Sequence, residues 1–133
     1  MVISKNKIED ESSSHKICPV FLTLSLIANK WSVRLLHALM QADKHCMRFG
    51  QLQKTLSGIS QRELTKHLRE FEMAGIVTRK SYPEVPPRVE YTLTKLGCSL
   101  NEPIEALAGW AQKYGKQIQK NTSSSKAFCN IKP

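Results

Sequence analysis

The spacing of apolar residues predicts two helices near the start of the chain. Val20, Leu24 and Ile27 recur at the three-to-four-residue period of a helix face, in a segment (residues 20–28) that is apolar on nearly every side. Pro19 precedes this segment, and the fixed φ of proline suits the first position of a helix. After a polar interruption, residues 31–39 show the same period and predict a second helix.

Two further helices are predicted in the middle of the chain, at residues 49–56 and 60–73. The later one has the clearest boundary signals. Ser60 and Glu63 have the spacing of a capping box, in which each side chain bonds a free backbone N–H group at the helix start. Gly75 suits the left-handed conformation that ends a helix, so the last turn is also predicted.

Beyond this helix the apolar period changes from helical to alternating, which is typical of strands. Residues 77–81 and 89–93 alternate, and a brief extended stretch is expected earlier, at residues 46–48. The loop between the two longer strands contains three prolines, Pro83, Pro86 and Pro87. The sequence therefore predicts a β-hairpin with a stiff loop.

A last helix is predicted after the hairpin. Thr94 can cap it, and an apolar stripe follows over residues 96–110. Pro103 has no N–H group to donate, so we expect a bend there.

The chain has 133 residues, which is the size of one domain. We expect a folded domain at residues 17–114 between a flexible N-terminal arm, residues 1–16, and a basic, disordered C-terminal tail, residues 115–133. No apolar stretch is long enough to span a bilayer, and acidic residues before the first apolar stretch argue against a secretory signal. We expect a cytoplasmic protein that does not associate with membranes.

The order of these elements is that of a winged helix-turn-helix, a mostly α fold with a small β-hairpin wing. In residues 60–73, Leu64 and Leu68 lie on one side of the helix. The opposite side carries three basic residues, Arg62, Lys66 and Arg69. A helix of this kind fits the major groove of double-stranded DNA, where Arg can bond guanine and Gln can pair with adenine.

The net charge of +9 agrees with a polyanionic partner. Arg79, Lys80 and Arg88 flank the proline-rich loop, where they can meet phosphates. The expected DNA contacts are Ser60, Gln61, Arg62, Thr65, Lys66, Arg69, Lys80 and Arg88. The alternative is a solvated outer face whose charges pair with Glu63 and Glu70 within the helix.

Several short motifs resemble the HxlR-type transcriptional regulators, which are relatives of the MarR winged-helix proteins. The resemblance covers about residues 18–112, and residues 82–91 are its most specific part. The other motifs are Cys18-Pro19-Val20, Lys30-Trp31, Arg48-Phe49, Gly58-Ile59-Ser60-Gln61, Leu64-Thr65, Leu68-Arg69, Gly75-Ile76-Val77 and Leu96-Gly97. The resemblance implies a homodimer that binds an operator through two recognition helices and two wings.

Members of this family commonly dimerise through their first and last helices, here residues 20–28 and 96–110. The residues themselves agree, because both segments have more apolar surface than one small domain can easily cover. The alternative is that both stripes belong to the internal core.

Cys18 is a candidate redox-sensing residue. It stands at a helix start, where the macrodipole favours a thiolate, and Lys16 is two residues away. Some members of the resembled family sense oxidants or electrophiles through a cysteine in this Cys-Pro position. The alternative is a small buried residue at a dimer contact. Cys46, Cys98 and Cys129 are possible partners, and no pairing follows from their spacing.

We therefore expect a sequence-specific transcriptional regulator that binds a near-palindromic operator as a homodimer and responds to redox state through Cys18. The alternative is a winged-helix protein-interaction module, or an RNA-binding protein without operator specificity. The sequence contains no phosphate-binding loop, metal-ligand cluster or catalytic set. We expect no enzyme activity, no cofactor and no metal.

Overall fold

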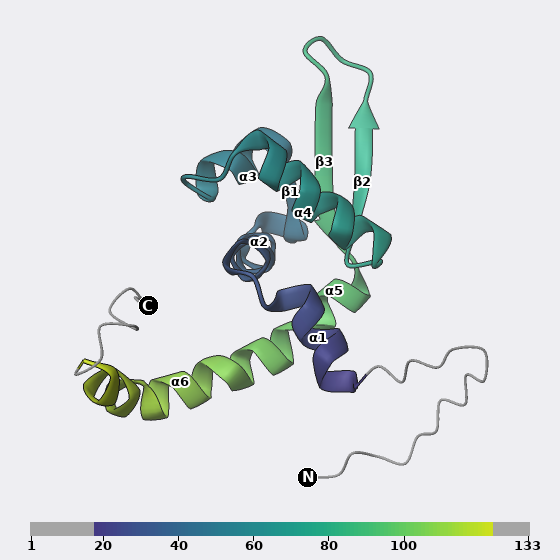
Figure 1. The fold of residues 1–133 in the computed structure, drawn as a ribbon. Helices are drawn as coiled ribbons and strands as arrows, with labels where there is room; N and C mark the ends of the chain where they lie inside the picture. The colour runs from purple at the N-terminus through teal and green to yellow at the C-terminus, as the bar shows by residue number, and fades with distance from the viewer. Residues whose placement is uncertain (1–17, 124–133) are drawn as a thin grey trace.

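The computed structural model describes residues 18–123, and within them a helical scaffold supports a three-stranded sheet (Figure 1). The helices that precede the β-hairpin are α1 (Pro19–Ile27), α2 (Lys30–Gln41), α3 (Phe49–Thr55) and α4 (Gln61–Met73), with a short 3-10 helix, η1 (Asp43–His45), after α2. The predicted arm at residues 1–16 lies outside the described residues.

The core lies where α2, α3 and α4 meet the sheet. Leu35 of α2, Leu52 of α3 and Leu64 and Leu68 of α4 have no solvent exposure, and Phe71 is also buried. The buried leucines of α4 are those that the helical period predicted. Burial of such side chains contributes roughly 1.5–3 kcal/mol each, so packing fixes the orientation of α4 about its axis.

Both ends of α4 follow from local sequence. Ser60 Oγ accepts a hydrogen bond from the Glu63 N–H group at 3.0 Å. The Glu63 carboxylate accepts from the Ser60 hydroxyl at 3.4 Å, where a full capping box would place a bond from the Ser60 N–H group. At the other end Gly75 has φ +78°, and the Ile76 N–H group donates to the Phe71 carbonyl at 2.8 Å. This is the Schellman arrangement that the glycine predicted.

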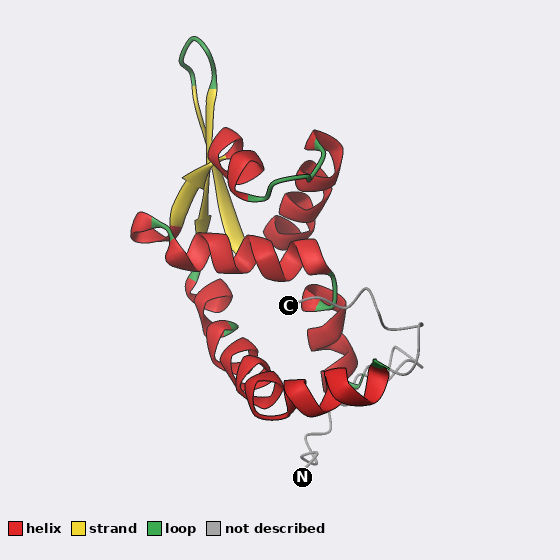
Figure 2. Ribbon diagram, turned by 90° about the vertical axis from the view of Figure 1, so that its left-hand side faces the viewer, coloured by secondary structure: helices red, strands yellow, loops and turns green. Residues whose placement is uncertain are grey.

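The sheet contains β1 (Cys46–Arg48), β2 (Val77–Tyr82) and β3 (Arg88–Leu93), all antiparallel in the order β1-β3-β2. The predicted extended stretch and hairpin are therefore confirmed. β2 and β3 extend past the helices as a wing, and in both ribbon views the wing tip and α6 lie at opposite ends of the molecule (Figures 1 and 2).

The last helix differs from its prediction in two ways. It is divided into α5 (Lys95–Ser99) and α6 (Asn101–Thr122), and the break falls at Leu100 instead of Pro103. Pro103 lies in the first turn of α6, where its missing N–H group removes no helical bond.

The predicted C-terminal tail begins at residue 115, which lies inside the last helix. Helix α6 continues through residues 115–122, which we expected to be disordered, and residues 124–133 lie outside the described residues. Tyr114 and Ile118 extend the apolar stripe of this helix, and that continuation was the signal for its greater length.

Candidate nucleic-acid interface

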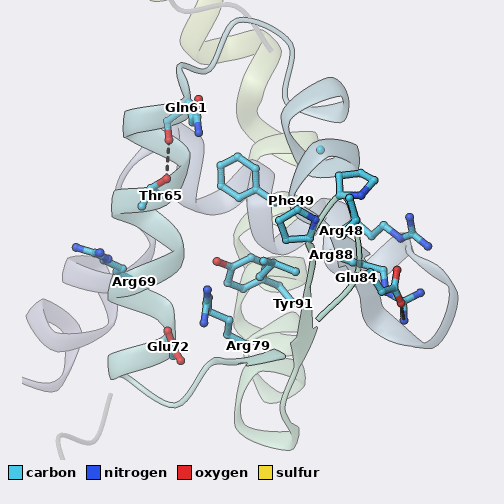
Figure 3. Close-up of a pocket in the computed structure, with 15 residues that line it drawn as sticks. Arg48, Phe49, Gln61, Thr65, Arg69, Glu72, Arg79, Glu84, Arg88 and Tyr91 are labelled. Carbon is cyan, nitrogen blue, oxygen red and sulfur yellow. Dashed lines mark hydrogen bonds and ion pairs between the residues drawn. The ribbon is translucent and has the colours of Figure 1, made fainter. Parts of the chain in front are cut away.

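The side of α4 that faces away from the core is open to solvent. Gln61, Arg62, Lys66 and Arg69 are exposed, and Thr65 is half-buried. The Thr65 hydroxyl donates to the Gln61 carbonyl at 2.8 Å (Figure 3). No ion pair within residues 18–123 includes Arg62, Lys66 or Arg69. The alternative in which Glu63 and Glu70 neutralise these cations is therefore not realised here.

A buried polar contact on the inner side of α4 helps to hold the helix against α2. His67 is 7% exposed, and its Nδ1 atom lies 3.5 Å from Ser32 Oγ. The same nitrogen lies 3.8 Å from a carboxylate oxygen of Glu70. Because Ser32 and His67 are both buried, this contact holds the inner side of α4 against α2, while the outer side of α4 stays exposed to solvent.

A groove of about 810 Å³ separates α4 from the wing. Figure 3 shows Phe49 and Tyr91 within it, between the two walls. Gln61, Thr65 and Glu72 line it from α4, and the proline-rich loop closes the wing side. The helix and the wing thus form two sides of one concave surface.

The wing loop is held by Arg88. Its Nη2 atom lies 3.0 Å from a Glu84 carboxylate oxygen, and its Nε atom lies 3.7 Å from Glu90. The guanidinium also stacks 3.9 Å from the centre of the Tyr82 ring. We expected Arg88 to contact phosphate. In the structure its guanidinium is paired with the carboxylates of Glu84 and Glu90, and its side chain is 25% exposed.

The register of the hairpin places adjacent basic residues on opposite faces. Arg79 lies directly across from Tyr91, and Lys80 lies directly across from Glu90. Opposed residues of antiparallel strands share a face. Because Tyr91 is buried on the core side, Arg79 faces the groove and Lys80 faces away from α4.

The sequence named Arg79 beside the loop but not among the expected DNA contacts, although the alternation of residues 77–81 separates it from Lys80. Lys80 does not line the groove, and its ammonium lies 5.1 Å from the centre of the Tyr82 ring. Figure 3 shows Arg48 and Arg88 on the side of the hairpin away from α4.

At the other end of the molecule, apolar side chains of α1, α5 and α6 are exposed to solvent. Helix α6 has 22 residues and none is buried, and in α1 only Ile27 is buried. The exposed apolar side chains are Val20, Phe21, Leu22 and Leu24 of α1, Leu96 of α5, and Leu107, Trp110, Tyr114 and Ile118 of α6. We call this set the apolar end. Its exposure in the single chain contradicts the alternative in which both stripes are internal core.

Cys18 lies beside the apolar end. It is the N-cap residue of α1, and it is half-buried and free. Lys16 and Cys129 lie outside the described residues. Within residues 18–123, no three His, Cys, Asp or Glu side chains gather as a metal site. No helix in that part of the chain has the length and hydropathy needed to cross a membrane.

An exposed basic helix beside a β-hairpin, on a helix-turn-helix scaffold, defines a winged-helix DNA-binding protein. Residues 26–119 match the HxlR-like helix-turn-helix family. YdeP of Bacillus subtilis (strain 168), an uncharacterized HTH-type transcriptional regulator, is 39% identical over 120 residues, which are 90% of this chain and 91% of that protein.

Solved structures of transcriptional regulators are also similar to this chain. A MarR-family transcriptional regulator from Enterococcus faecalis V583 has a TM-score of 0.68 and 35% identity, over 90% of this chain and 99% of that one. The redox regulator HypR in its oxidized form has a TM-score of 0.62 and 38% identity, over 72% of this chain and 96% of that one. The chain belongs to the HxlR-like helix-turn-helix family, and it is a transcriptional regulator of HxlR/MarR type.

Proposed function

We propose that the protein binds a specific near-palindromic operator in double-stranded DNA, with α4 in the major groove. The observation that carries this proposal is the exposed, unpaired basic side of α4, whose opposite side is fixed in the core. Gln61, Arg62 and Lys66 are the base-reading residues, and Thr65 and Arg69 support them from the same helix. Ser60 caps the helix, and its position at the helix start supports a phosphate contact as well.

The operator is identified by selecting preferred duplexes from a random pool. Arg62→Ala should then change the preferred base at one position of each half-site, because a bidentate guanine contact carries about 1–3 kcal/mol of discrimination. Arg88→Ala should weaken binding to all duplexes alike, since that residue shapes the wing. If no duplex is preferred, a parallel selection from a random pool of single-stranded RNA separates the two alternatives: enrichment there supports RNA binding, and no enrichment in either pool supports a protein-interaction module.

We also propose that the protein acts as a homodimer through the apolar end. A 22-residue helix with no buried residue leaves its apolar stripe in water unless another chain covers it. A second copy of this chain supplies a matching surface, because two-fold pairing brings the same patch together with itself. Two copies of α4 would then meet half-sites about one helical turn, roughly 34 Å, apart.

We further propose that oxidation of Cys18 alters DNA binding. Support comes from its position next to the apolar end and from the similarity to HypR, a redox regulator. Diamide can accept two electrons and two protons from a pair of thiols as they form a disulfide, and Cys18 would be one of that pair. The second thiol is left open between the partner copy and the other cysteines of the chain.

The test compares operator affinity before and after diamide treatment. Wild-type affinity should change and recover with dithiothreitol, whereas Cys18→Ser should keep one affinity throughout. Cys98→Ser changes another half-buried cysteine: it should respond to diamide as the wild type does if the second thiol lies elsewhere, and it should lose the response if Cys98 is that thiol. If Cys18→Ser changes affinity on oxidation as the wild type does, Cys18 is not the sensor.

A further inference from the structure

One charged side chain in the groove between α4 and the wing comes from the wing and not from α4. Arg79 reaches into this groove from β2, beside Tyr91 (Figure 3). It is exposed, and within residues 18–123 it forms no ion pair. A guanidinium in this state is available to an anion, and its planar fork suits the two oxygens of a phosphate.

The groove presents both apolar and charged side chains, and a nucleic-acid strand has both apolar and charged groups to meet them. Phe49, Tyr91 and Val89 supply apolar surface inside it, and Pro86 and Pro87 continue that surface along the wing. A sugar–phosphate backbone offers apolar deoxyribose edges and charged phosphates in alternation. The apolar residues can pack against sugars while Arg79 meets a phosphate.

The charge of the lining favours an anion. Four arginines and two glutamates line the groove, and one glutamate, Glu84, is already paired with Arg88. Glu72 of α4 is the other carboxylate, and it forms no ion pair among the described residues. Figure 3 shows the Arg79 side chain inside the groove, whereas Arg69 and Arg48 point to its outer sides, so Arg79 is the cation available within it.

We propose that this groove holds the backbone of one DNA strand, and that Arg79 makes a phosphate contact there which Lys80 does not make. The inference rests on the proposed function, because a strand enters the groove only when α4 occupies the adjacent major groove. The backbone that borders that major groove then passes between helix and wing. Lys80 is excluded by its position on the other face of the same strand.

The experiment uses the full chain and the selected operator duplex, with binding followed by fluorescence anisotropy at several salt concentrations. Each phosphate contact contributes about 0.9 to the slope of log Kd against log salt concentration. Arg79→Gln should lower that slope by about 0.9, so its loss of affinity between about 50 and 200 mM salt should be roughly threefold smaller. Lys80→Gln, which removes the same charge one residue away, should leave the slope almost unchanged.

The contact is then located on the DNA. One phosphate at a time is replaced by an uncharged methylphosphonate through each half-site. At one or two adjacent positions the replacement should weaken the wild type and have no further effect on Arg79→Gln. Arg79→Lys should keep most of the salt slope, and Glu72→Gln should bind more tightly than the wild type because it removes a carboxylate from the groove.

The outcomes separate the inference from the function on which it rests. If the wild type selects no duplex, the proposed function fails. If it selects a duplex but Arg79→Gln keeps the wild-type slope, only the inference fails. The inference is also overturned if Lys80→Gln shows the larger loss, or if Arg79→Gln changes base preference with no change of slope. Thermal unfolding of each variant confirms that its fold is intact.

Discussion

Gly97 is the position where one added methyl group should damage the fold most. An alanine Cβ there would overlap the Ile76 carbonyl oxygen, and it would lie 2.8 Å from Leu93 Cδ2 and 3.2 Å from the Ile76 carbonyl carbon. Two of these three atoms are backbone, so no rotamer change relieves the overlap. Overpacking of a closed site costs about 1–3 kcal/mol, and a backbone obstacle puts Gly97→Ala at the upper end, about 3 kcal/mol.

The cost is large because the Ile76 carbonyl has other partners. It accepts from the Thr94 N–H group at 3.0 Å and from the Thr94 hydroxyl at 3.1 Å. Moving this carbonyl away from a new methyl group would weaken both bonds. With a total stability of about 5–15 kcal/mol, a loss of about 3 kcal/mol lowers the midpoint of unfolding substantially.

Urea unfolding at a fixed protein concentration measures this effect, since an assembling protein changes apparent stability with concentration. Gly50→Ala is the control, because Gly50 lies in α3 and an added Cβ would have no heavy atom within 4 Å. That variant should unfold at the wild-type midpoint or gain up to about 1 kcal/mol from better helix propensity. If Gly97→Ala unfolds together with Gly50→Ala, the packing argument is wrong.

Two further predictions concern the apolar end and the start of α4. Trp110→Glu should convert a dimer into a monomer in analytical ultracentrifugation, because it places a charge in the middle of the apolar end. Met73→Glu is its control: Met73 is 85% exposed but lies at the end of α4, so its variant should keep the wild-type mass, and a monomer for both variants would refute the assignment of the interface. Ser60→Ala should lower the free energy of unfolding by about 1 kcal/mol, because the Glu63 N–H group loses its acceptor. Thermal unfolding measures this loss, and equal stability of Ser60→Ala and the exposed variant Ser57→Ala would contradict it.

Features that depend on neighbouring residues were predictable from the sequence. The cap at Ser60, the stop at Gly75 and the buried leucines of α4 all follow from positions within one helix. The division of the last helix at Leu100 was not predictable in the same way. The helix before the break, α5, packs with Gly97 against the Ile76 carbonyl, a contact that spans 21 positions in the chain and that no local period encodes.

The candidate site shows the same limit. The alternation of residues 77–81 placed Arg79 and Lys80 on opposite faces, but only the register with β3 and the burial of Tyr91 show which face adjoins α4. Charge alone also did not show that Arg88 is paired with carboxylates. Its proximity to Glu90 follows from the two-residue period of β3, but its contact with Glu84 depends on how the loop folds back onto that strand.

Thr94 joins the wing end of the molecule to its apolar end through three hydrogen bonds. The Thr94 hydroxyl donates to the carbonyls of Gly75 and Ile76, at the end of α4 and the start of the wing, and it accepts from the Gly97 N–H group at 3.0 Å. Thr94 thus links the stop of the basic helix, the base of the wing and the start of α5, from which α6 continues. In a dimer paired through α6, the direction of that helix relative to α4 sets the distance between the two basic helices. A small rotation of α6 about Thr94 and Gly97 would therefore change the distance between the two copies of α4. The dimer would then fit a different half-site spacing, while the DNA-reading surface of each subunit stays intact.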